Sequence, residues 1–156
     1  MIVDGRAIAQ DILKETHALV EGLSRELVIR AIVVAPSPAT ESYLKVKMAR
    51  AKDAGMRMEV VRLPDAATTE EVIAAVTAPG SDSVIVQLPL PEELHTDAIL
   101  ASIPREQDAD VLSAAAYAAF EQELPDALLP PVADAVAEIC VRSVVSVAGM
   151  KALVVG

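Results

Sequence analysis

Short apolar runs rich in valine and isoleucine recur along this chain, and segments with helical patterning separate them. These side chains branch at Cβ and fit the pleated surface of a strand, and continuous apolar runs of this length are typical of strands covered on both faces. The predicted strands cover residues 28–34, 58–63 and 83–88. Because helices alternate with them, we predict an α/β domain with three αβα layers. Its mainly parallel sheet is built from βαβ units with right-handed crossovers.

Helices are predicted by apolar residues at helical spacing and by capping residues at helix ends. Gly55 is typical of a helix C-terminus, and Thr68 with Glu71 resembles a capping box at an N-terminus. The predicted helices cover residues 5–23, 40–54, 68–77, 97–102, 114–120 and 132–142. A last strand is predicted at residues 151–155.

Two turns lie at the carboxyl ends of predicted strands, where open parallel sheets bind ligands. The turn at residues 35–40 leads into the helix that carries Tyr43 and Lys47, one turn apart on a single face. The turn at residues 87–91 begins with Gln87, a polar residue that ends an apolar run. An aromatic platform, a proton carrier and a group that orients it are the parts of an acid–base site. The plainer interpretations are a solvated lysine, a core tyrosine and a glutamine that caps a strand end.

Composition narrows the classes of function. The formal charge of −10 on 156 residues argues against partners rich in phosphate, so we expect neither nucleic acid nor an anionic membrane surface to bind. No apolar run reaches the roughly 18 residues of a membrane-spanning helix, and the N-terminus lacks the order of a signal peptide. We therefore expect a cytoplasmic protein. Basic residues gather between residues 45 and 62, where they either attract an anionic substrate tail or form a solvated helix face.

Cysteine and histidine give no metal-ligand spacing, so no metal site is predicted. Cys140, the single cysteine, lies in an apolar helical pattern and is predicted to be a buried structural thiol. His17 is expected on a solvated helix face, and His95 lies in a loop with no assigned role.

The motifs around the two turns resemble the catalytic domain of the bifunctional methylenetetrahydrofolate dehydrogenase/methenyltetrahydrofolate cyclohydrolase family. The first motif reads Pro38-Ala-Thr40-Glu-Ser-Tyr43-Leu-Lys-Val-Lys47, with threonine in place of the family's serine. The second is intact from Val86 to Pro91, as Val-Gln-Leu-Pro-Leu-Pro. The opening Asp4-Gly5 segment and the closing segment from Gly149 to Gly156 also resemble the family, so the resemblance runs the length of the chain.

The resemblance implies a role for each predicted site residue. Lys47 assists water attack on the methenyl bridge and carries protons, Gln87 positions that lysine, and Tyr43 is the wall on which the folate rings rest. Asp110 is implied to hold the pterin's amino group and ring nitrogen, which suits a carboxylate. Leu88 and Pro89 complete the implied substrate-binding set.

Several positions depart from the family pattern near Asp110. Gln107 replaces a lysine, Val111 replaces a glycine, and alanines at residues 114–116 replace an asparagine. Valine resists backbone conformations that glycine adopts freely. We therefore expect the loop after Asp108 to differ from the family's folate-binding loop.

The resemblance also implies how the chain is organised. Residues 1–148 are expected to form the catalytic domain, and residues 149–156 the first strand of a truncated NAD(P)-binding domain. The full-length family couples NADP-dependent oxidation of methylenetetrahydrofolate to hydrolysis of the methenyl product and is commonly dimeric. We expect this chain to bind a tetrahydrofolate derivative, not NADP, and to retain at most the hydrolysis. A homodimer is possible. The alternative is a non-catalytic folate-binding or subunit-interaction domain on the same scaffold.

Overall fold

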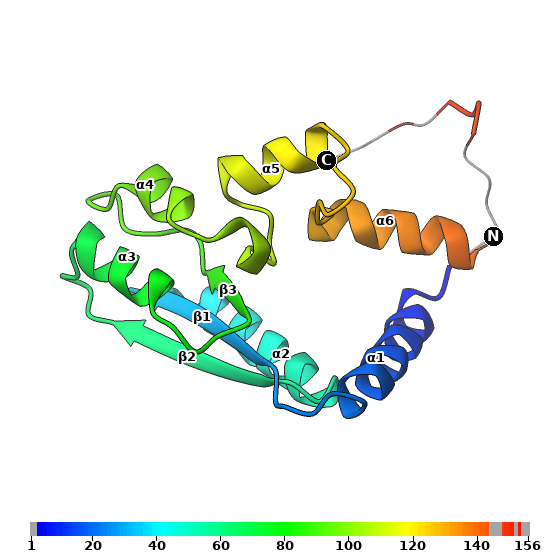
Figure 1. Cartoon of the computed structure of the whole chain (residues 1–156), viewed down its shortest axis with the longest axis horizontal. Coiled ribbons are helices and arrows are strands. Elements are labelled where there is room, and N and C mark those ends of the chain that lie inside the picture. Colours follow the sequence, from blue (N-terminus) through cyan, green and yellow to red (C-terminus); the bar gives the residue numbers. More distant parts are fainter. Residues whose placement is uncertain (1–2, 144–147, 152, 154–156) are drawn as a thin grey trace.

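The computed structural model describes residues 3–143, 148–151 and 153. A small sheet with its covering helices lies at one end of the molecule, and helices α1 and α6 lie at the other (Figure 1). The elements are α1 (Gly5–Glu21), β1 (Val28–Val34), α2 (Pro38–Asp53), β2 (Arg57–Leu63), α3 (Thr69–Thr77), β3 (Ser83–Val86), α4 (Thr96–Ala101), the 3-10 helix η1 (Arg105–Gln107), α5 (Ala114–Glu121) and α6 (Pro131–Arg142).

The sheet is parallel and has the strand order β2-β1-β3. Strand β1 is central and pairs along its whole length with β2. Residues 29–32 of β1 also pair with β3. The chain passes from β1 to β2 through α2, then crosses back over β1 to β3 through α3. Because right-handed crossovers in opposite directions use opposite faces, α2 and α3 cover different sides of the sheet.

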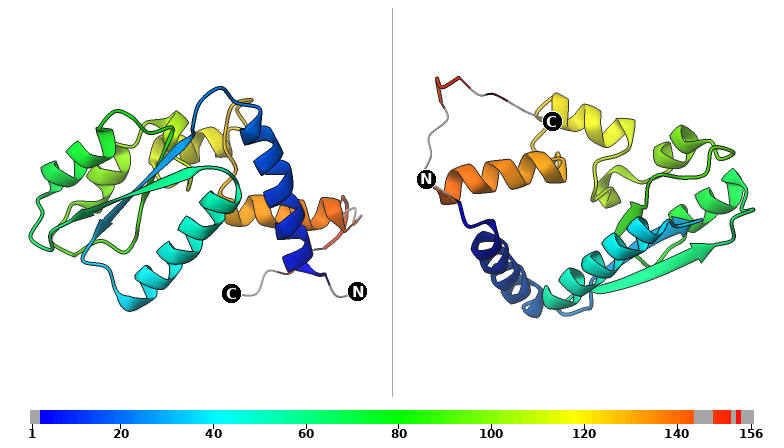
Figure 2. Two further views of the ribbon diagram at one scale, coloured as in Figure 1. Left: turned by 90° about the horizontal axis from the view of Figure 1, so that it is seen from below. Right: turned by 180° about the vertical axis from the view of Figure 1, so that it is seen from behind.

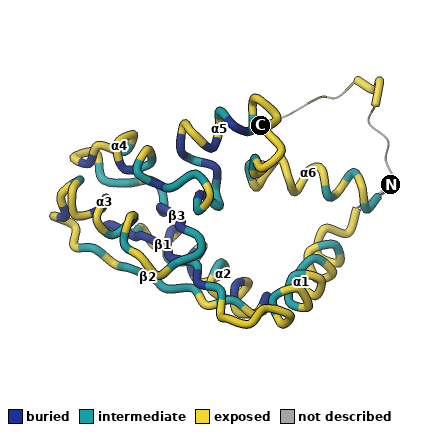
Figure 3. Tube along the Cα trace, viewed as in Figure 1, coloured by how far each residue is buried: buried dark blue, intermediate teal, exposed yellow. Residues whose placement is uncertain are grey.

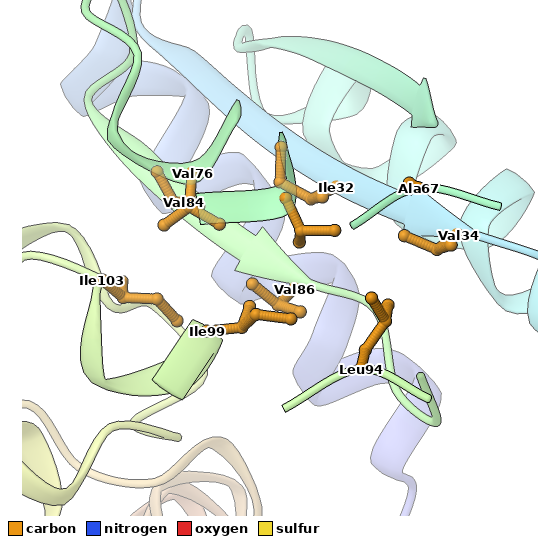
Figure 4. Close-up of a cluster of buried hydrophobic side chains, with 10 residues drawn as sticks. Ile32, Val34, Ala67, Val76, Val84, Val86, Leu94, Ile99 and Ile103 are labelled. Carbon is orange, nitrogen blue, oxygen red and sulfur yellow. The ribbon is translucent and has the colours of Figure 1, made fainter. Parts of the chain in front are cut away.

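Alternate side chains of β1 enter two separate cores. Ile32 and Val34 belong to a cluster that includes side chains from α3 and α4 (Figure 4). Ala31 and Val33 face the other way and pack with Leu44 of α2. All four β1 side chains are at most 2% exposed. Helices on both faces of a parallel sheet confirm the predicted α/β fold.

Arg30 interrupts the apolar pattern of β1 and is nevertheless buried. Its Nη2 donates to Pro79 O at 2.9 Å, and its Nη1 donates to Ala78 O. Glu59 of β2 lies 3.5 Å from the same Nη2. Arg30 thus satisfies the carbonyls of the turn between α3 and β3, as a buried guanidinium requires.

Helices α1 and α6 contain no buried residue and extend away from the sheet (Figures 2 and 3). They are joined by Arg142 of α6, whose Nη1 and Nη2 donate to the two carboxylate oxygens of Glu15 at 3.0 and 2.7 Å. The Nε of Arg142 donates to Glu138 at 2.7 Å. These bonds lower the pKa of Glu15 and raise the pKa of Arg142. A bidentate ion pair, not a shared core, links the two helices.

Three sequence expectations need correction. The third strand ends at Val86 instead of residue 88, because Leu88 precedes a proline and the chain turns there. Cys140 is half-buried instead of buried, because the described chain leaves α6 largely uncovered. His17 is half-buried against Gly55, and its Nδ1 is enclosed without a hydrogen-bond partner in the described chain. The strand predicted at residues 151–155 lies mostly outside the described residues.

Two features are absent from the residues that the structure describes. None of their helices is both long enough and apolar enough to cross a membrane. None of their histidine, cysteine and carboxylate side chains gather in a group that could hold a metal ion.

Candidate active site

The first predicted turn places α2 at the carboxyl end of β1. Ala35 adopts a φ of 43°, which turns the chain sharply after the strand. Ser37 then caps α2: its Oγ accepts from Thr40 N at 3.1 Å and lies 2.9 Å from Thr40 Oγ1. Pro38 occupies the first turn, where a missing N–H costs nothing. The helix therefore begins two residues before the predicted Thr40, and the cap fixes the direction of the helix that carries Tyr43 and Lys47.

Lys47 and Asp110 meet although 63 residues separate them in the chain. Lys47 Nζ donates to Asp110 Oδ2 at 3.1 Å, and the side chains are 34% and 26% exposed. The pair is thus only partly shielded, and both groups keep access to solvent. A lysine and a carboxylate with free lone pairs can hold an ordered polar ligand and exchange protons with it.

Tyr43 lies one helical turn before Lys47 and is 69% exposed. The ring of Tyr43 is therefore not part of a core, and the plainer interpretation of a core tyrosine is wrong. An exposed ring offers a flat apolar face with a polar tip to a ligand.

Gln87 follows directly after β3, and its backbone N–H donates to Ile32 O at 2.9 Å. Its side-chain Nε2 donates to Leu88 O at 3.0 Å, whereas its Oε1 is buried and finds no partner within the described chain. No hydrogen bond joins Gln87 to Lys47 across the residues that the structure places. A buried acceptor without a donor marks a position where a ligand, a water molecule or a moved side chain could donate.

Leu88 and Pro89 continue from Gln87 along the second turn. Leu88 is half-buried and packs against the core cluster of β1, α3 and α4. Pro89 is exposed, and the peptide bond between these residues is cis. The two side chains thus differ: one belongs to the core, and the other stands free at the surface.

The loop that carries Asp110 contains a buried residue to which no role was assigned from the sequence. Asp108 has no exposed surface, and its carboxylate accepts from Leu112 N at 3.1 Å and from Ser113 N at 2.7 Å. Its backbone forms a bridge with Val84 of β3. The signal in the sequence was present, because aspartate commonly bonds backbone N–H groups a few residues ahead.

Val111 stands where the resemblance implies a glycine. It adopts a φ of 53°, the left-handed region that valine resists. The loop therefore takes a glycine-like conformation in spite of its side chain, which is 5% exposed. The surrounding contacts impose this backbone on the valine.

Two cavities lie near the candidate site. A mainly apolar cavity of about 300 Å³ lies beside Lys47 and is also lined by Leu13 and Thr16 of α1 and by Ile85 of β3. A larger cavity of about 720 Å³ lies between α1 and α6, and none of the predicted site residues lines it. We assign the site to the Lys47 region because Lys47 and Asp110 meet there.

Most of the basic segment at residues 45–62 is paired with carboxylates. Arg62 binds Glu41 through two bonds of 2.6 and 3.0 Å, Arg57 binds Glu26, and Arg50 binds Asp53. The bonds from Arg62 lower the pKa of Glu41. Lys45 and Lys52 are exposed and form no ion pair with any residue in the described ranges. This favours the solvated face over an anion-binding patch.

Comparison with known proteins decides the family. Residues 3–110 match the family described as tetrahydrofolate dehydrogenase/cyclohydrolase, catalytic domain. This chain belongs to that family. The bifunctional protein FolD 1 of Rhizobium meliloti is 33% identical over 122 residues, which cover 73% of this chain and 40% of that protein.

Solved structures of family members have the same fold. The Trypanosoma brucei methylenetetrahydrofolate dehydrogenase-cyclohydrolase, complexed with NADP cofactor and an inhibitor, is 30% identical with a TM-score of 0.85, covering 96% of this chain and 54% of its own. The silkworm methylenetetrahydrofolate dehydrogenase is 27% identical, also with a TM-score of 0.85, covering 92% and 52%. This chain thus spans about half the length of its relatives.

The strand-to-helix turns in the described part of the chain do not fit a dinucleotide cofactor. Dinucleotide phosphates typically bind where a glycine-rich turn follows a strand and opens a helix. Within the described ranges, the turns from β1 to α2 and from β2 to α3 contain no glycine. The implied NADP site therefore does not lie on these elements.

Proposed function

We propose that this chain is the folate-binding catalytic domain of a one-carbon enzyme and hydrolyses methenyltetrahydrofolate to formyltetrahydrofolate. The contact between Lys47 Nζ and Asp110 Oδ2, 3.1 Å apart, carries the proposal. It brings the first family motif and the Asp110 loop to one place. Both side chains lie within the matched residues 3–110.

Lys47 is the proposed proton carrier. Water adds to the cationic methenyl carbon and loses one proton. The resulting hydroxyl loses its proton as the formyl carbonyl forms, while a ring nitrogen takes up a proton and its bond to that carbon breaks, so one proton is released overall. An amine beside the reacting carbon can accept the first proton and deliver one to the ring nitrogen, which is worth roughly 10²–10⁴ in rate for positioned acid–base groups. Gln87, with its buried and unpartnered Oε1, is proposed to orient the lysine when substrate is bound.

Asp110 is the proposed anchor for the pterin. A carboxylate has two oxygens and about four lone-pair sites. It can therefore accept from the pterin's amino group and ring nitrogen while one site still accepts from Lys47. Tyr43, with its exposed ring, is proposed to stack on the folate, and Leu88 and Pro89 are proposed to border it.

Oxidation of methylenetetrahydrofolate is proposed to belong to a longer form of the protein. Hydride transfer needs a nicotinamide cofactor, and the strand-to-helix turns that the structure describes do not fit one. Added NADP should therefore bind weakly at best and leave hydrolysis by this chain unchanged.

Replacement of Lys47 tests the proposal. Lys47→Met keeps the aliphatic stem, so hydrolysis should fall by roughly 10²–10⁴ while circular dichroism stays the same. Lys45→Met is the matched control, because Lys45 is exposed on the same helix and forms no ion pair with a described residue; its rate should match the wild type. Loss of methenyl absorbance measures the rate. A wild-type rate equal to that of buffer would contradict the enzyme assignment.

A non-catalytic folate-binding domain is the second candidate, and the departures around Val111 favour it. Calorimetry with 5-formyltetrahydrofolate separates the two, since that candidate predicts binding without hydrolysis. The Asp110→Ala variant should weaken this binding in either case, because it removes the anchor.

We propose that the protein is cytoplasmic. We also propose that this chain, when isolated, associates with further copies of itself. Several apolar side chains of α6 and its preceding loop are 42–79% exposed: Leu124, Leu128, Leu129, Val132, Val136 and Val141. Exposed apolar groups of this kind promote contacts between copies. Sedimentation at rising concentration should show a growing average mass, and a constant monomer mass would contradict this.

A further inference from the structure

Asp108 is a buried carboxylate that the proposed reaction does not use. It is 0% exposed, and its two oxygens accept from separate backbone N–H groups, at Leu112 and Ser113. Its own backbone pairs with Val84 of β3. One residue therefore ties the sheet to the N-terminus of α5, because Ser113 is also the α5 cap. Bonds of this kind to a charged group are among the stronger ones in proteins.

The turn that Asp108 closes contains a residue in an unfavourable conformation. Val111 N donates to Asp108 O at 3.2 Å, and Val111 has a φ of 53°. A β-branched residue in the left-handed region costs energy and persists only where its surroundings enforce it. The two bonds to the Asp108 carboxylate begin at the next residue after Val111, so they oppose relaxation of the turn.

Asp110 lies inside this turn, between Asp108 and Val111. Its carboxylate contacts Lys47 at 3.1 Å, and no described residue other than Lys47 bonds to it through a side chain. The direction of the Asp110 side chain is therefore set by the backbone of the turn. A shift of that backbone would move the carboxylate away from the lysine.

We propose that Asp108 is a positioning residue that holds the turn at residues 108–111 against the strain at Val111, and so keeps Asp110 against Lys47. The expected effect of Asp108 on turnover rests on the function proposed above. The contact between Asp110 and Lys47 does not depend on that function, and it is tested without turnover.

Zero-length carbodiimide coupling tests the geometry in the full chain without turnover. It joins an amine to a contacting carboxylate with loss of water, and mass spectrometry of peptides measures the product. The yield of the Lys47–Asp110 cross-link is divided by that of Lys14–Asp11, a second pair at 3.5 Å on α1. In Asp108→Asn, the amide nitrogen cannot accept a backbone N–H. We expect the ratio to fall about tenfold, as for loss of one hydrogen bond to a charged group.

The double variant Asp108→Asn/Val111→Gly tests the role of the strain. Glycine adopts positive φ freely, so the turn should need Asp108 less and recover about half of the wild-type ratio or more. A ratio that stays low in the double variant would overturn the strain argument. An unchanged ratio in folded Asp108→Asn would overturn the positioning role itself.

A folding control accompanies both variants. If circular dichroism shows that Asp108→Asn is unfolded, Asp108→Ser takes its place, because a hydroxyl can accept one N–H without placing a buried amide donor. The same fall in the cross-link ratio is expected.

Where the wild type hydrolyses methenyltetrahydrofolate, Asp108→Asn should raise KM, since Asp110 anchors the substrate. A wild type that cross-links but does not hydrolyse would end the proposed function and leave the positioning role standing.

Discussion

The sheet and the α1–α6 pair of this molecule are held together by different forces. Strand β1 contributes side chains to cores on both of its faces, and four of them are at most 2% exposed. Helices α1 and α6 have no buried residue and are joined by the Arg142 ion pairs. The Lys47–Asp110 contact lies outside these two helices, between α2 and the loop before α5. Rigid elements position catalytic groups better than loosely attached ones do, so the buried half of the chain is the half suited to chemistry.

Truncation of a core residue should show the largest difference between the two regions. Ile32→Ala removes a side chain with 0% exposure from the centre of the sheet, and should cost about 2–5 kcal/mol of unfolding free energy. Val136→Ala on α6, where the side chain is 57% exposed, should change stability by about 0.5 kcal/mol or less. Urea unfolding measures both. Equal losses would show that α6 is covered in solution.

Removal of the serine that caps α2 should have a smaller effect on stability. This change should also alter the geometry of the candidate site. Ser37→Ala removes the acceptor for Thr40 N and should cost about 1 kcal/mol. The Lys47–Asp110 cross-link should weaken with it, since the cap fixes the helix that carries Lys47. Ser42→Ala, exposed on the same helix, serves as the control. A stability loss in Ser37→Ala with an intact cross-link would show that the cap does not set the site geometry.

Lowering the pH should have the smallest effect on stability. As the pH falls, the α1–α6 contact should open before the sheet does. The hydrogen bond from Arg142 lowers the pKa of Glu15 below its ordinary value of 4.5. The contact is therefore fully stabilised above that value and loses its stabilisation as pH falls through the lowered pKa. Hydrogen exchange, corrected for intrinsic rates, should show α1 and α6 opening in acid while β1 stays protected. Arg142→Gln should open them at neutral pH, and identical protection in the wild type and in Arg142→Gln would refute the tether.

The sequence placed most elements and the two motif turns correctly, because these depend on local physical chemistry. Valine-rich runs form strands, and Thr68 with Glu71 forms the predicted capping box. Cys140 shows the limit of such patterns. An apolar helical pattern gives the direction in which a side chain points, but it does not reveal whether anything covers that face.

By itself, the sequence determined the α/β alternation, the family motifs, and the choice of Tyr43, Lys47, Gln87 and Asp110 as candidates. Only the tertiary structure decided how they meet. It placed Asp110 against Lys47 across 63 residues, buried Asp108 in the same loop, and imposed a positive φ on Val111. The physical reason is range: capping and periodicity act within a few residues. The partner of a side chain in a loop depends on where distant strands bring that loop.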